Sequence, residues 1–317
     1  MLQSATFWPE LAYSKWRDTA ATLHLWTQVV GKVRLALSPW INHSWQVAFY
    51  VTARGLGTSP IPVGEEILEL EFDFIAHRLA VRTSRGEERH IPLEPQSVAD
   101  FHHRVMSLLN ELGIQVTINE MPNEVADPIA FSKDNRHHVY EAAASHAFWR
   151  ALVQADRLFR YFRSGFLGKA SPVHFFWGSF DLAVTRFSGR RAPLHPGGVP
   201  GLPDAVAQEA YSHEVSSAGF WPGNDAFPAA AFYSYAYPEP PGFRNHATAP
   251  GAYFETKLGE FILPYERVRT AADPDALLLD FLSSTYSAAA QEGGWDRAQL
   301  ECPLGIPGQV RRLPLLA

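Results

Sequence analysis

The stretch FLGKASPVHFFWGSFDLAVTR, residues 166–186, decides the fold because it repeats an order that the chain has already used once. Residues 29–54, VVGKVRLALSPWINHSWQVAFYVTAR, carry the same succession of Gly-Lys, Pro, an aromatic and histidine cluster, and a β-rich run. In each copy an arginine, Arg54 or Arg186, is the ninth residue after a tryptophan. The pattern predicts two similarly ordered units, related by an ancient duplication or by ordinary recurrence of α+β units.

Hydrophobic periodicity predicts helices and strands on both sides of these stretches. Apolar residues at three- and four-residue steps predict a helix within 11–37, and the glycines before Lys32 and Lys169 are natural helix C-caps. Alternating and β-branched runs predict an antiparallel meander over 45–53, 67–74, 78–83 and 89–93. Further helices are predicted after the N-cap Ser97, over 148–162, and from Pro274.

The expected fold is therefore α+β, with two helix–antiparallel sheet–helix units at 1–125 and 126–300 and a C-terminal tail at 301–317. The second unit differs from the first by a long insertion at 190–253, which holds 10 of the 24 prolines. Its aromatic residues argue against disorder, so we expect an ordered, loop-rich cover over the second sheet.

Composition narrows the classes of function. The net charge of -6 offers no sustained positive field for nucleic acid, so a small-molecule ligand or another protein is the expected partner. Cys302 is the single cysteine, which excludes an intrachain disulfide and a cysteine metal cluster. Because no signal peptide or long apolar segment is visible, we expect a cytoplasmic protein without a membrane span.

Familiar catalytic motifs are absent. The chain has no G-x-G-x-x-G after a strand, no P-loop, no G-x-S-x-G and no H-E-x-x-H. No cofactor is indicated, and a catalytic role has to be argued from single residues.

The first group of candidate residues lies along one predicted strand. His174 has the chemistry of a general base or a metal ligand, although a histidine bonded inside an aromatic core is the more frequent case. Asp181 is a candidate carboxylate, and Trp177 and Arg186 are candidate substrate contacts. Asp181 and Arg186 are five residues apart, so a regular strand directs them to opposite faces.

The second group lies in EAYSHEVSSAGFWPG, residues 209–223. His213 and Glu214 stand between the aromatic residues Tyr211 and Trp221, so groups that move protons lie beside rings that can close a pocket. The alternative is a solvated Glu214 and a His213 that caps a turn.

Three functional hypotheses follow. The leading one is an enzyme that acts on a small organic substrate by acid–base chemistry, with His174 and His213 transferring protons, Glu214 or Asp181 orienting them, and Arg186 or Lys169 holding an anionic group. The second is a metal-dependent enzyme with His174, His213 and Glu214 as ligands. The third is a non-catalytic binding cleft for a small molecule or a protein.

Long strings of the sequence resemble a bacterial family known only as domain of unknown function 5996. The resemblance rests on GKASPVHFFWGSFDLAVTRFSGRRAPLHPGG, YSHEVSSAGFWPG, VTARGLGTSPIP and the opening WPELAYSKWRDTAATLHLWTQVVGKVRLAL. It covers nearly the whole chain except about the last fifteen residues, which implies one full-length family unit. It implies no activity, cofactor or catalytic residue.

Overall fold

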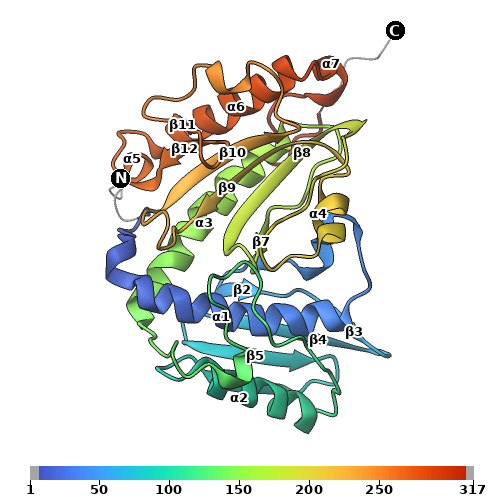
Figure 1. The fold of residues 1–317 in the computed structure, drawn as a ribbon, viewed down its shortest axis with the longest axis vertical. Helices are drawn as coiled ribbons and strands as arrows, with labels where there is room; N and C mark the ends of the chain where they lie inside the picture. The colour runs from blue at the N-terminus through green and yellow to red at the C-terminus, as the bar shows by residue number, and fades with distance from the viewer. Residues whose placement is uncertain (1–6, 312–317) are drawn as a thin grey trace.

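Two antiparallel sheets and the helices around them make up the computed structural model, which describes residues 7–311 (Figure 1). Sheet 1 has the order β1-β2-β4-β5-β6, with β3 paired to β4. Its strands are β1 Tyr50–Val51, β2 Gly55–Gly57, β3 Ile61–Val63, β4 Glu66–Asp73, β5 Arg78–Thr83 and β6 Glu88–Pro92. The expected α+β class is confirmed.

Sheet 2 is built from the second half of the chain. Its order is β11-β12-β10-β9-β8-β7, and every neighbouring pair is antiparallel. Its strands are β7 His174–Phe176, β8 Asp181–Arg191, β9 His213–Trp221, β10 Ala231–Tyr237, β11 Tyr253–Glu255 and β12 Glu260–Pro264.

Local signals explain where several helices begin. At the start of α2, the side chain of Ser97 accepts a hydrogen bond from the backbone N–H of Asp100. Asp273 directly precedes α6, which begins at Pro274, and its side chain accepts from the backbone N–H of Ala276. The α-helices are α1 Tyr13–Leu37, α2 Val98–Glu111, α3 Ala142–Ser164, α4 Asp204–Ala210, α5 Tyr265–Arg269, α6 Pro274–Glu292 and α7 Arg297–Leu300. Short 3₁₀ turns are η2 Asn42–Val47, η3 Phe131–Lys133 and η4 Phe243–Asn245.

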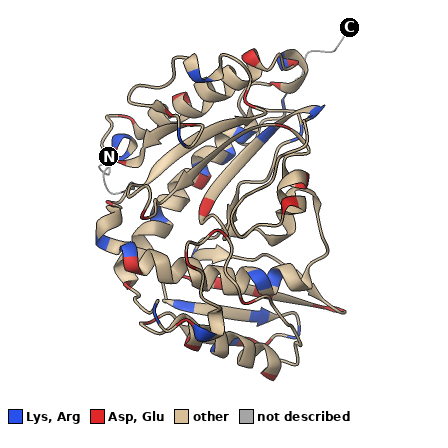
Figure 2. Ribbon diagram, viewed as in Figure 1, with Lys and Arg blue, Asp and Glu red and all other residues tan. Residues whose placement is uncertain are grey.

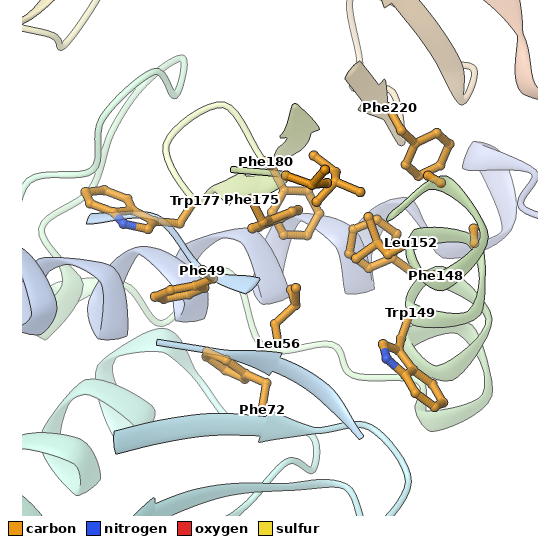
Figure 3. Packing of buried hydrophobic residues seen from close by; sticks show 14 of the residues in the cluster. Phe49, Leu56, Phe72, Phe148, Trp149, Leu152, Phe175, Trp177, Phe180 and Phe220 are labelled. Carbon is orange, nitrogen blue, oxygen red and sulfur yellow. The ribbon is translucent and has the colours of Figure 1, made fainter. Parts of the chain in front are cut away.

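The core runs continuously from one sheet to the other. Helices α1 and α2 pack together over sheet 1, and α3 and α6 cover one face of sheet 2 (Figure 1). The sheets meet where Phe49 and Phe175 exchange two backbone hydrogen bonds, each 2.8 Å long. Figure 3 shows Phe49 and Phe175 among the buried rings between the sheets. This contact fixes the start of sheet 2 against the first half of the chain.

The segment 45–53 differs from the strand expected there. The structure has η2 over Asn42–Val47, followed by the two-residue strand β1. His43 and Ser44 take left-handed backbone angles, with φ of 60° and 58°, which a strand does not permit. The expected extended structure is thus confined to the bridge at Phe49 and to β1, whereas residues 45–47 belong to the turn η2.

Gly31 does not end a helix, contrary to the C-cap expected before Lys32. Helix α1 continues to Leu37, and Gly31 lies in its buried part. A Cβ atom on Gly31 would lie 2.3 Å from the ring of Trp177, so the glycine lets this ring pack directly on the helix backbone. The glycine of this repeated Gly-Lys order therefore has a packing role in α1. In the second copy, α3 ends at Ser164 and its C-cap is Gly165, so Gly168 does not end the helix either.

The segment 190–253 contains more regular structure than the loop cover expected for it. Strands β9 and β10 are central strands of sheet 2, and α4 lies before them. The connections 192–203, 222–230 and 238–252 carry the prolines and are irregular except for the turn η4. Prolines mark the connections here, whereas alternating small and aromatic residues between them form the strands.

Candidate functional site

One face of sheet 2 forms the wall of a cleft of about 1570 Å³. Along β8 the side chains of Asp181, Ala183, Thr185 and Phe187 line the cleft, whereas the alternate ones pack toward α3. Helices α1 and α4 and the segment 117–127 supply further lining. The volume exceeds the roughly 300–1,000 Å³ of ordinary small-molecule pockets.

Asp181, at the start of β8, is the most enclosed acid of the cleft, with 7% of its surface exposed. Ser179 Oγ donates to Asp181 Oδ1 over 2.8 Å, and the hydroxyl of Tyr233 donates to Oδ2. Burial raises the pKa of Asp181, whereas these two hydrogen bonds favour the ionised carboxylate. The side chain is therefore held in one orientation at the edge of the cleft.

Glu124 reaches the same region from the irregular segment between α2 and α3. Its neighbour Asn123 is fixed to α1 by two hydrogen bonds of 2.8 Å, since Gln28 Oε1 accepts from the Asn123 N–H and Gln28 Nε2 donates to the Asn123 carbonyl. Glu124 Oε1 lies over Gly178, where an added Cβ would be only 2.5 Å away. The glycine leaves the room that this carboxyl group occupies.

Glu260 brings a third carboxyl group from β12. Ile262 is the register partner of Tyr233, so Glu260, two residues earlier, faces the same side of the sheet as the Tyr233 ring. We call Glu124, Asp181 and Glu260 the carboxyl cluster.

Two carboxyl groups of the cluster are weaker acids than usual, because their pKa values are raised. Desolvation, and then the negative charge of Asp181, raise the pKa of Glu124 to about 7 and that of Glu260 to about 7. No basic side chain of residues 7–311 offsets these shifts. A carboxyl group with a pKa near neutrality exists in both protonation states and can donate or accept a proton.

Tyrosine hydroxyls surround the carboxyl cluster. The hydroxyls of Tyr211 and Tyr235 lie 2.9 Å apart, and both rings line the cleft. Burial raises the pKa of Tyr211, and it raises those of Tyr233 and Tyr235 well above the usual value. These hydroxyls stay protonated. Tyr233 gives its single hydrogen to Asp181, and one hydroxyl of the Tyr211–Tyr235 pair donates to the other, so one hydrogen of the pair is left for a ligand.

His174 lies on the cleft side of β7 and is 1% exposed. Its Nδ1 is 2.8 Å from the Pro172 carbonyl oxygen, which can only accept, so Nδ1 carries the hydrogen. Nε2 is buried and has no hydrogen-bond partner within residues 7–311, and burial lowers the pKa of His174 to about 4. At neutral pH this ring is uncharged.

The structure does not bring the three expected metal ligands together. His174 is opposite Ala183 and His213 is opposite Arg191, so eight residues of β8, roughly 20 Å or more, separate them along the sheet. Glu214 points to the other face of β9 and is paired with Arg190 at 2.7 Å. Within residues 7–311, no group of three or more His, Cys, Asp or Glu side chains is arranged to hold a metal ion.

The expected substrate contacts divide between the two faces of sheet 2. Arg186 is on the helix-covered face, where its guanidinium lies 3.6 Å from the centre of the Phe162 ring. Trp177 is buried, and its Nε1 donates to the Val47 carbonyl over 2.8 Å. Lys169 is exposed near Phe187, whereas Trp221 and Tyr211 line the cleft.

Glu124, Glu260 and Tyr233 were not identified from the sequence. Glu124 lies within the irregular run 119–127, which carries no recognisable motif, and Glu260 follows the turn glycine Gly259. One signal was available: Tyr233 and Tyr235 alternate on a strand, which places both on one face. The carboxyl groups come from three segments far apart in the chain, so no spacing connects them.

The chain as a whole belongs to a known family. It matches the family of unknown function DUF5996 over residues 8–302, and it is a member of that family. No curated protein and no solved structure matched the chain. Among the described residues, no helix has the length and apolar character needed to cross a membrane.

Proposed function

We propose that this protein is an enzyme that acts on a small organic molecule in the cleft by acid–base chemistry. The observation that carries the proposal is the carboxyl cluster: three acids from separate segments face one cleft, and no basic side chain in the described part of the chain is paired with them. Placing like charges together in a partly desolvated site costs stability, and such arrangements are concentrated at catalytic sites.

The roles follow from the surroundings of each group. Asp181 is fixed by two hydrogen bonds, and its charge favours the protonated forms of Glu124 and Glu260. Glu124 is the proposed proton donor and acceptor, because it is exposed to the cleft while its pKa is about 7. The tyrosine hydroxyls would hold polar groups of the substrate.

A purely binding cleft is the competing function. Such a cleft would orient its ligand with groups that do not titrate near neutral pH. The raised pKa values of Glu124 and Glu260 favour catalysis over binding alone.

The test is a search for turnover in deuterated water. Purified protein is incubated with a mixture of small metabolites, and mass spectrometry records each compound that is consumed, formed or deuterated. We expect at least one such change with the wild type and a rate lower by about a hundredfold or more in Glu124→Gln and Asp181→Asn, in the range that one acid–base group contributes.

Glu65→Gln serves as the matched control, since Glu65 is exposed in the turn between β3 and β4. It should react like the wild type. Equal conversion by the wild type and by both cleft variants would refute the proposal. So would a compound that the wild type retains from the mixture without altering it, which would indicate a binding protein.

A further inference from the structure

A second group of titratable side chains lies beside the end of the cleft that His43, Trp45 and Phe187 line. Lys169 Nζ is 2.6 Å from His43 Nε2, and it lies 4.8 Å from the centre of the Phe187 ring and 5.5 Å from that of Trp45. The rings of His43 and His213 are 6.2 Å apart. These residues come from η2, β8, β9 and the connection between α3 and β7.

The hydrogen bonds fix which atom donates. His43 Nδ1 is 2.9 Å from the Ala210 carbonyl oxygen at the end of α4, so Nδ1 carries the ring hydrogen. His43 is 5% exposed, and burial lowers its pKa, so Nε2 is a free acceptor. Lys169 therefore donates one hydrogen to His43, and its other two donors have no partner in the described structure.

His43 is held in a backbone conformation that costs energy. Its φ of 60° and that of Ser44, 58°, are both left-handed, and neither residue is glycine. Two such residues in succession persist only where the surroundings require them, and they occur preferentially at ligand sites. Here they turn the imidazole between Ala210 and Lys169.

Positive groups are crowded at this end, and within residues 7–311 no ion pair joins Lys169 or Arg191 to an acid. The pKa of His213 is lowered by desolvation and then by the charges of Lys169 and Arg191. Glu209 is the nearby acid, and its carboxylate accepts a hydrogen bond from Trp40 Nε1. In the view of Figure 2, by contrast, acidic and basic residues are interspersed over the elements.

We propose that Lys169, with His213 and Arg191, binds an oxyanion of the ligand, and that His43 positions the Lys169 ammonium group. The chemistry is that of a carboxylate or a phosphate, since an ammonium group and an imidazole donate to anionic oxygens. Trp45 and Phe187 supply flat apolar faces beside it. The positive charge of Lys169 and Arg191 is opposite in sign to the negative charge of the carboxyl cluster.

The two ends define the shape of the substrate, and this step rests on the proposed function. Asp181 and Phe187 are six residues apart on β8, which corresponds to roughly 20 Å. A ligand that reaches both ends is elongated, with its anionic group at Lys169 and its reacting group at Asp181. The large cleft volume accommodates such a molecule.

Calorimetric titration with inorganic phosphate and with acetate, at constant ionic strength, tests the oxyanion site. We expect saturable binding of one or both by the wild type, at least tenfold weaker in Lys169→Gln. The exposed Lys257 provides the matched control, and Lys257→Gln should bind like the wild type. His43→Phe should weaken binding to a smaller extent, because Lys169 is retained but no longer oriented.

The outcomes separate the two proposals. If phosphate binds more tightly than acetate, the oxyanion of the ligand is a phosphate group; if acetate binds more tightly, it is a carboxylate. Absence of saturable binding, or equal affinity in Lys169→Gln and the wild type, overturns the oxyanion site. Asp181→Asn should keep its oxyanion affinity, so a failed turnover test with intact oxyanion binding would refute the acid–base enzyme alone.

Discussion

The hydroxyl of Tyr233 on β10 donates a hydrogen bond to Oδ2 of Asp181 on β8, although β9 lies between the two strands. Gly219 makes this possible: it is the register partner of both Tyr233 and Ala183, and an added Cβ would be 2.3 Å from the phenolic oxygen. The ring therefore lies across the backbone of β9. One glycine thus determines how a distant tyrosine reaches the carboxyl cluster.

Tyr233→Phe should raise the pKa of Asp181 further, because the lost hydrogen bond favours the ionised form. Gly219→Ala should act in the same direction by displacing the ring, with a loss of about 1–3 kcal/mol of stability from overpacking. Carbon-13 NMR titration of the aspartate carboxyl groups measures the shift. Tyr235→Phe is the control, since the Tyr235 hydroxyl bonds to Tyr211; a shift as large in this variant would contradict the prediction.

Glu260→Gln should stabilise the protein at pH 8. The folded-state pKa is raised to about 7, so ionisation of Glu260 opposes folding; this penalty is absent below the unfolded pKa of about 4.3 and is complete above about 7. After allowance for its partial exposure, we expect a gain of about 1 kcal/mol at pH 8 and little at pH 4.

Urea unfolding at the two pH values measures this difference. Glu65→Gln, in an exposed turn, should change stability at neither pH. A Glu260→Gln variant that is less stable than the wild type at pH 8 would show that the carboxylate is favourably bound in the fold.

His174 should make the protein less stable in mild acid. Its folded-state pKa is lowered to about 4, so the unfolded chain binds the proton first; the stability is fully present above about 6.5 and is lost as the pH falls toward 4. The loss amounts to about 2 kcal/mol at pH 5.

His174→Phe removes this part of the pH dependence. Between pH 7.5 and pH 5, the free energy of unfolding should fall by about 2 kcal/mol less in the variant than in the wild type. The loss of the hydrogen bond to the Pro172 carbonyl lowers the stability of the variant equally at both pH values, so it does not affect this difference. His103→Phe, at an exposed position of α2, should follow the wild type. Parallel curves for His174→Phe and the wild type would rule out a buried neutral His174.

Gly31→Ala should destabilise the protein by about 2 kcal/mol, although alanine favours helix more than glycine does. The reason is the Trp177 ring, which occupies the position of the new Cβ. In combination with Trp177→Phe the cost should be smaller, because phenylalanine leaves space. Unfolding free energies of both single variants and the double variant give the coupling; strictly additive costs would exclude this contact.

Elements whose signals are local were predictable from the sequence. Ser97 and Pro274 mark helix starts because a cap or a fixed φ acts within one turn, and β4 and β5 show their alternation directly. Residues 45–53 misled the same reasoning, since burial and strand formation select similar side chains. The duplication of the two halves remains a prediction from their common order.

The site was less predictable than the fold. Asp181 was among the expected residues, and Lys169 was a candidate for holding an anion, but the histidines singled out from the sequence lie far apart on sheet 2. Glu214 was assigned chemistry, whereas its strand parity and Arg190 place it in an ion pair on the other face. Parity depends on where a strand begins, which the sequence alone did not specify.

The sequence by itself determined the class of fold, the starts of α2 and α6 and the family to which the chain belongs, because these depend on neighbouring residues or on long strings. Only the tertiary structure decided that positions 124, 181 and 260 share one cleft and that His43 holds Lys169. The physical reason is that their proximity arises from sheet register and from glycines that permit close approach. Neither the sheet register nor the position of these glycines produces a periodic pattern in the sequence.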